Sequence, residues 1–100
     1  MIELNESNFK ESACQGLVLL DFYTNFCGPC KMLAPVLEKI ENIKVFKIDA
    51  SSNPNLTAEH NISSVPTLIY MRDGVVLEKT IGYMSQEQIQ AKVNKFNTSN

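Results

Sequence analysis

The sequence predicts an α/β fold, with a central mixed β-sheet of four to five strands flanked by four helices. The first observation is a strand, a helix and a second strand within about 32 residues, which is the arrangement of a parallel βαβ unit with a right-handed crossover. The second is a later pair of strands joined by a short turn, which is typical of an antiparallel hairpin. A sheet that contains both kinds of pairing is mixed.

The chain is predicted to begin with a short strand near residues 2–4 and a weak helix. Phe9 and Ala13 are the apolar residues that indicate this helix. Residues 17–23, LVLLDFY, form a nearly continuous apolar run. Such a run is expected of a strand that is covered on both faces.

A long amphipathic helix is predicted over residues 28–42. Its apolar residues recur at the i, i+3, i+4, i+7 spacing of one helical face. They are Leu33, Val36, Leu37 and Ile40. Residues 44–48 then predict the next strand, which completes the βαβ unit.

Two further helices are predicted in the second half. Asn53 is a typical N-cap and Pro54 suits the first helical position, so a short helix should run to about His60. Ser85 and Gln88 have the spacing of a capping box at the start of the last helix. The apolar residues of that helix are Ile89, Val93 and Phe96, and the polar tail 97–100 is expected to fray.

A β-hairpin is predicted between these helices, with strands over 67–71 and 75–81 and a turn at 72–74. Alternation in the second strand predicts one buried face and one wetter face. The buried face would hold Val75, Leu77 and Ile81, and the wetter face Val76, Glu78 and Thr80.

Composition is that of an ordinary globular protein, so residues 1–100 are expected to form a single domain. Of the residues, 44% are hydrophobic and 20% charged, and the net charge is −2. This balance gives no basic surface for nucleic acid or for an anionic membrane. Residues 1–26 lack the basic start and the apolar stretch of a targeting signal. We therefore expect a cytoplasmic protein, although a processed organellar protein would have the same features.

The chain contains three cysteines and one histidine. Three cysteines cannot all pair within one chain, so a disulfide-stapled scaffold is a poor interpretation. Cys27 and Cys30, however, lie where the first long strand ends and the long helix begins. The free N–H groups and the positive end of the dipole at a helix start favour a thiolate there.

The spacing of Cys27 and Cys30 suits a reversible disulfide. Residues three apart lie on the same helical face, and a slight tightening of the turn brings the sulfurs within bonding distance. Pro29 is tolerated in the opening turn, where its missing N–H costs little. A pair that opens and closes within one turn is a redox switch.

With this motif the sequence resembles the thioredoxin family over almost the whole chain. A bare C-x-x-C is weak evidence, whereas CGPC between a strand and a helix with a later Val-Pro-Thr is specific. The matching residues are Asp21-Phe22, Cys27-Gly28-Pro29-Cys30-Lys31-Met32, Ala34-Pro35, Lys47-Ile48-Asp49, Val65-Pro66-Thr67, Asp73-Gly74 and Gly82.

The resemblance implies roles for four of these residues. Cys27 would attack a substrate disulfide, and Cys30 would resolve the resulting mixed disulfide. Asp21, an acid in an apolar strand, would be buried with a raised pKa and would accept the proton of Cys30. Lys47 on the neighbouring strand would tune the pKa of Asp21.

The resemblance also implies an active-site turn and a substrate groove. The turn comprises Phe26, Gly28 and Pro29 beside the two cysteines. The groove would contain Phe26, Val65, Pro66, Thr67 and Gly82. Pro66 would be cis and would face the cysteines, so that the backbone of Val65 could pair with an extended client segment.

The activity that the resemblance implies is reduction of protein disulfides by a monomeric domain with no bound cofactor. Thioredoxin reductase would return the protein to its dithiol form with electrons from NADPH, and the other partners would be disulfide-containing client proteins. One alternative is a binding or chaperone subunit on the same fold, in which redox turnover is incidental. Another is an oxidant that makes disulfides, which suits an unsecreted chain poorly.

Two other features of the chain bear on this interpretation. A structural zinc site from Cys14, Cys27, Cys30 and His60 has enough ligands, but Cys14 and His60 lie on separate segments. Cys14 is instead expected to be a packing residue and His60 to be solvated. The family usually has Trp where this chain has Tyr23 and Phe26, which bears on partner preference but not on the exchange chemistry.

Overall fold

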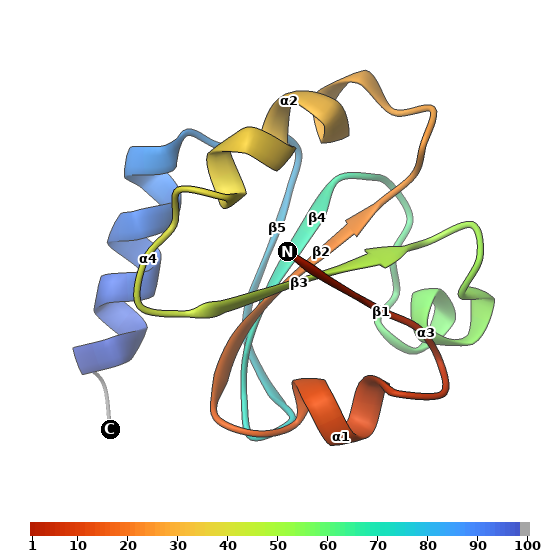
Figure 1. Ribbon diagram of the computed structural model, residues 1–100, viewed down its shortest axis with the longest axis horizontal. Helices are drawn as coiled ribbons and strands as arrows, with labels where there is room; N and C mark the ends of the chain where they lie inside the picture. The colour runs from red at the N-terminus through yellow and green to blue at the C-terminus, as the bar shows by residue number, and fades with distance from the viewer. Residues whose placement is uncertain (99–100) are drawn as a thin grey trace.

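The computed structural model describes residues 1–98, which form five strands and four helices (Figure 1). The elements are β1 (Ile2–Leu4), α1 (Phe9–Ala13), β2 (Leu17–Tyr23), α2 (Gly28–Leu37), β3 (Lys44–Asp49), α3 (Pro54–Glu59), β4 (Thr67–Arg72), β5 (Val75–Ile81) and α4 (Gln86–Thr98). The strands form one sheet in the order β1-β3-β2-β4-β5. The first three of these are parallel, while β4 is antiparallel to both β2 and β5, so the predicted mixed sheet is confirmed.

The sheet separates two hydrophobic cores. Alternate residues of β2 point to opposite faces of the sheet, so Leu20 lies on one face and Leu19 on the other. Helices α1 and α3 cover the first face, and α2 and α4 cover the second (Figure 1). The central strand β2 is therefore buried on both faces, as its apolar run predicts.

Helix α2 is shorter than the predicted 28–42 span. It ends at Leu37, and the chain continues in a tight turn in which Lys39 N donates to Val36 O and Ile40 N to Leu37 O. These i to i−3 bonds are the 3₁₀ type that often closes a helix. The turn still directs Ile40 into the core, so the apolar spacing holds beyond the α-helix.

The predicted burial of β5 is wrong. Val75, Leu77 and Ile81 are exposed by 64%, 39% and 61%. The pairing of β4 with β5 shifts register between Tyr70 and Met71, where β5 contains one extra residue. The extra residue reverses the alternation of faces, so Val75, Leu77 and Ile81 do not share one face. β5 is also an edge strand, and its half-buried side chains are those of Glu78 and Thr80.

The start of α3 is capped differently from the prediction. Asn53 occupies the cap position, but its side chain makes no capping bond and instead donates to Asp49 O. The Glu6 carboxylate accepts from the backbone N–H groups of Asn55 and Leu56. A negative group at this end is favourable for the helix dipole, so a residue 49 positions away supplies the cap.

Three smaller predictions concern the ends of helices. Ser85 and Gln88 exchange the two hydrogen bonds of a capping box, as predicted. His60 is half-buried rather than fully solvated: its ring packs against Phe9 and Phe22, with centroids 5.4 and 5.5 Å away. Helix α4 extends through Thr98, and the rest of the predicted frayed tail lies outside the described residues.

Candidate functional site

The two cysteines of the CGPC motif are joined by a disulfide at the N-terminus of α2. The Cα atoms of Cys27 and Cys30 are 5.2 Å apart. Cys27 is the N-cap residue, and its Sγ accepts a hydrogen bond of 3.2 Å from the backbone N of Cys30. An N–H directed at this sulfur favours its negative form.

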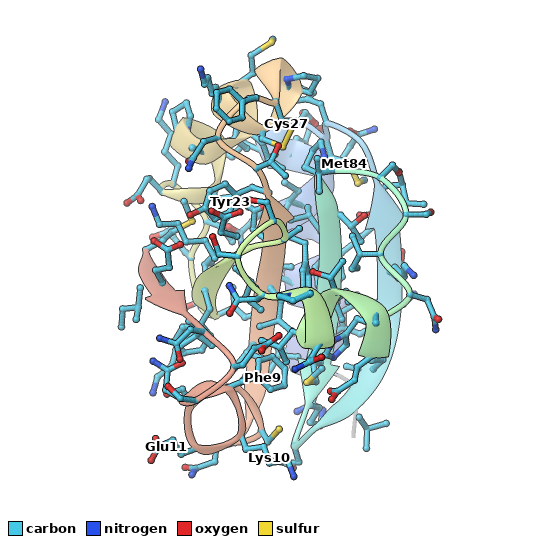
Figure 2. The ribbon with its side chains drawn as sticks, turned by 90° about the vertical axis from the view of Figure 1, so that its right-hand side faces the viewer. Phe9, Lys10, Glu11, Tyr23, Cys27 and Met84 are labelled. Atoms are coloured by element: carbon cyan, nitrogen blue, oxygen red, sulfur yellow. A yellow bond between two sulfur atoms is a disulfide. The ribbon has the colours of Figure 1, made fainter. Side chains whose placement is uncertain are left out.

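The two sulfurs differ in their access to solvent. Cys30 is 4% exposed, whereas Cys27 is half-buried and adjoins Phe26, which is 98% exposed. Figure 2 shows Cys27 at one end of the molecule, with Phe9, Lys10 and Glu11 of α1 at the other. An external sulfur can therefore approach Cys27 far more readily than Cys30.

A loop from β4 lies beside Cys27. The Val65–Pro66 peptide bond is cis, as expected, and Cys27 Sγ lies 3.7 Å from the carbonyl oxygen of Val65. Thr67 Oγ1 donates to Ser64 O at 2.7 Å, which ties the two ends of this loop together. The structure thus brings Val65 next to the nucleophile that the sequence predicted.

Gly82 belongs to the same surface. Its N–H donates to Pro66 O at 2.8 Å, and its φ of +93° is a conformation that favours glycine. A Cβ on Gly82 would meet no atom within 4 Å. The backbone conformation, rather than a lack of space, is what requires glycine here.

Asp21 lies beneath the disulfide in the middle of β2. It is 3% exposed, and its Oδ1 has no hydrogen-bond partner. Burial raises the pKa of Asp21 from 3.8 to about 7, and the positive charge of Lys47 partly offsets that rise. The predicted raised pKa and the predicted influence of Lys47 both have a physical basis in the structure.

A cavity of about 170 Å³ connects Asp21 to the second cysteine. Its lining includes Asp21, Cys30 and Lys47, together with Tyr23. The volume is enough for several water molecules. Asp21 and Cys30 therefore line the same cavity, which is partly open to solvent.

Tyr23 has contacts that the sequence analysis missed. Its hydroxyl donates to Glu3 Oε2 at 2.5 Å, and the Lys47 Nζ lies 5.6 Å from the centroid of its ring. Burial, followed by the hydrogen bond to Glu3, raises the pKa of Tyr23. In the sequence, Tyr23 stood out only because the family usually has Trp at that position. No residue near Tyr23 in the sequence indicated a contact with Glu3.

The residues of the alternative zinc site do not converge. Cys14 is a free, half-buried cysteine that packs against the core on the α1 side, next to Gly74. His60 packs against aromatic rings on the same side. Within residues 1–98, no three His, Cys, Asp or Glu side chains are grouped closely enough to hold a metal ion.

Comparison with known proteins gives one consistent result. Residues 1–95 match the family model described as Thioredoxin. The chain is 39% identical over 99 residues to a thioredoxin of Listeria monocytogenes, an alignment that covers 94% of this chain and 96% of the relative. It is 36% identical over 100 residues to a thioredoxin of Bacillus subtilis, covering 95% and 96% of the two chains.

The fold also matches a solved structure. A mutant thioredoxin from Halobacterium salinarum NRC-1 superposes with a TM-score of 0.90 at 27% identity, covering 99% of this chain and 92% of that one. No helix in the described part of the chain, residues 1–98, has the length and apolar character to cross a membrane.

Proposed function

The chain belongs to the thioredoxin family, and on this basis we propose that it reduces disulfide bonds in client proteins through Cys27 and Cys30. The observation that carries the proposal is the asymmetric cysteine pair at the start of α2. One sulfur is accessible and is capped by a backbone N–H, and the other is buried beside a cavity that contains a carboxyl group.

The proposed reaction starts from the dithiol form. The Cys27 thiolate attacks one sulfur of a client disulfide, forms a mixed disulfide and expels the other client sulfur as a thiolate. The Cys30 thiol then gives its proton to the Asp21 carboxylate, and its sulfur attacks that of Cys27. The client leaves with two reduced sulfurs, and the two electrons that it gained came from the sulfurs of Cys27 and Cys30, which are oxidised to a disulfide.

Asp21 suits the role of proton acceptor because its pKa of about 7 lies near neutral pH. A carboxyl group with this pKa is partly ionised at neutral pH and binds the thiol proton only moderately tightly. Lys47 would hold the pKa of Asp21 below the value that burial alone would impose. Both assignments are part of the proposal.

The client would lie across the surface between the active-site turn and the β4 loop. Phe26, with Gly28 and Pro29, would form one side, and Val65 with Gly82 the other, while the buried Pro66 and Thr67 would support the loop that presents Val65. Phe26 offers a large exposed apolar side chain. The half-buried Val65 next to Cys27 offers backbone groups to an extended peptide.

We further propose that residues 1–100 act as one monomeric domain in the cytoplasm, where they contribute to electron transport and redox homeostasis. Thioredoxin reductase would regenerate the dithiol with electrons from NADPH, and the domain itself would hold no cofactor. A glutathione-poised compartment keeps such thiols reduced. The chain would then serve as a carrier between the reductase and many clients.

Substitution of each cysteine in turn tests the assignment. Cys30→Ser should accumulate mixed disulfides with an insulin substrate on non-reducing gels, because no resolving thiol remains. Cys27→Ser should accumulate none, and Cys14→Ser is the matched control that should behave as the unaltered protein. Adducts with Cys27→Ser but not with Cys30→Ser would reverse the proposed roles.

A reductase-coupled assay separates reduction from simple binding. With NADPH and thioredoxin reductase, the unaltered protein should reduce many equivalents of insulin. A binding or chaperone subunit would release thiols only in stoichiometric amounts. That second result would overturn the proposed function.

A further inference from the structure

A row of three charged residues crosses the α2 side of the sheet below the active site. The strand register places Glu3 of β1 opposite Lys47 of β3, and Lys47 opposite Asp21 of β2. Opposite residues in neighbouring strands point to the same face. The Lys47 ammonium thus has one carboxyl group on each side, and these two groups compete for its charge.

The side chain of Tyr23 contacts both Glu3 and Lys47. Its hydroxyl donates to the Glu3 carboxylate, and its ring lies 5.6 Å from the Lys47 ammonium. Within residues 1–98, Lys47 is not within ion-pair distance of either Glu3 or Asp21. One tyrosine therefore engages the outer carboxylate and the cation at the same time.

We propose that Tyr23 is a positioning residue for the proton transfer to Asp21: its hydroxyl holds Glu3 so that the Lys47 charge acts on Asp21 and does not pair with Glu3. The inference rests on the proposed function, in which Asp21 accepts the proton of Cys30. It adds two residues to the site, Tyr23 and Glu3, of which neither touches the reacting sulfurs.

The other charges near this cavity are few and come from each neighbouring element. Helix α2 contributes Lys31 to the lining, and Met1 also lines the cavity, while its amino group pairs with Glu38 at 3.0 Å. Asp49 lies opposite Tyr23 on β3. The charge that acts appreciably on the pKa of Asp21 is that of Lys47.

Removal of the Tyr23 hydroxyl should therefore change the titration of Asp21. In Tyr23→Phe the ring remains, but Glu3 is released and can pair with Lys47. We expect the Asp21 midpoint to rise by about 0.5 pH unit, the size expected when one charge interaction near a protein surface is redirected. Carboxyl ¹³C NMR of the oxidised protein measures this midpoint without interference from the cysteine thiols.

The decisive variant combines Tyr23→Phe with Glu3→Gln. Since no carboxylate then competes for Lys47, the Asp21 midpoint should return to its original value or fall below it. A purely structural role of Tyr23 would lower stability without such a reversal. Glu11→Gln, which removes an exposed acid at the opposite end of the molecule, is the matched control and should leave the midpoint unchanged.

Two results would overturn the inference. One is an unchanged Asp21 midpoint in Tyr23→Phe, and the other is a raised midpoint that Glu3→Gln fails to reverse. Stopped-flow measurement of mixed-disulfide resolution against pH separates this inference from the proposed function. In one outcome the NMR midpoints move as expected, while the pH dependence of the resolution rate stays the same in all variants. That result would uphold the charge arrangement and refute the proton-acceptor role of Asp21.

Discussion

Two buried aspartates of the same sheet, Asp21 and Asp49, have pKa values that are shifted in opposite directions. Asp21 is 3% exposed and Asp49 8% exposed, but burial is the main influence on the pKa of Asp21 and only a secondary one on that of Asp49. Hydrogen bonds from Ser51 are the main cause that lowers the pKa of Asp49, whereas burial without a partner for Oδ1 raises the pKa of Asp21 to about 7.

The donors around Asp49 come from its own loop. The Ser51 backbone N and Oγ donate to Oδ1 at 3.0 and 2.7 Å, and Ser52 Oγ donates to Oδ2 at 3.1 Å. Asp21 lies in the middle of a strand whose backbone groups are used by the sheet. Deep burial of the Asp21 carboxyl, and hydrogen bonds to the Asp49 carboxylate, therefore shift the two pKa values in opposite directions.

Asp21→Asn should give the largest effect, a gain in stability at pH 8 of up to about 4 kcal/mol. The folded pKa is about 7 and the ordinary value 3.8, so the folded state retains a proton that the unfolded state releases between these values. Asp21 therefore lowers the stability of the folded state as pH rises through this window. Urea unfolding of the oxidised protein at pH 4 and pH 8 checks this, and an equal effect at both pH values would contradict it.

The same substitution should slow mixed-disulfide resolution by about 100-fold, within the range typical of a lost general base. The attack by Cys27 should change much less, because that step does not use Asp21. Stopped-flow kinetics with separate attack and resolution phases measures both rates. Equal slowing of the two phases would place Asp21 outside the resolving step.

Asp49→Asn should have the opposite sign, a loss of about 1 to 2 kcal/mol near neutral pH, because charge-assisted bonds are weakened. The lowered pKa of Asp49 contributes stability that is present above the unfolded pKa and is lost as pH falls through the folded pKa. Urea unfolding from pH 7 downward tests this sign. The resolution rate should not change, and a slowed rate would show that the two acids are less distinct than proposed.

Ser51→Ala should give the smallest effect, a loss of about 1 kcal/mol, because only the side-chain donor to Asp49 is removed. The pKa of Asp49 should rise toward its ordinary value, as a carboxyl ¹³C titration would detect. Asp21 should titrate as before. A parallel rise at Asp21 would mean that the two sites are coupled through Tyr23.

Features that depend on neighbouring residues were predictable from the sequence. The LVLLDFY run, the start of the helix that follows Cys27 and the Ser85–Gln88 capping box are local patterns, and each has the expected form. The acid within an apolar run marked Asp21 as a buried group. These patterns succeed because one strand or one helical turn contains the whole cause.

Features that depend on distant residues were not predictable. The bulge between Tyr70 and Met71 decides which side chains of β5 face inward, and no residue of β5 encodes it alone. Glu6 caps a helix that begins nearly fifty residues later. The contact of Tyr23 with Glu3 needs the register of three strands at once, so it becomes visible only when the sheet is assembled.

The location of Cys14 limits the route that electrons can take. Cys14 precedes β2 and Cys27 follows it, so a strand of seven residues, about 23 Å long, lies between the free thiol and the active pair. Cys14 cannot reach a client that is bound to Cys27 in the same molecule. Strand β2 thus separates the free thiol from the active pair, and of the three cysteines only Cys27 and Cys30 are placed to exchange electrons with a client.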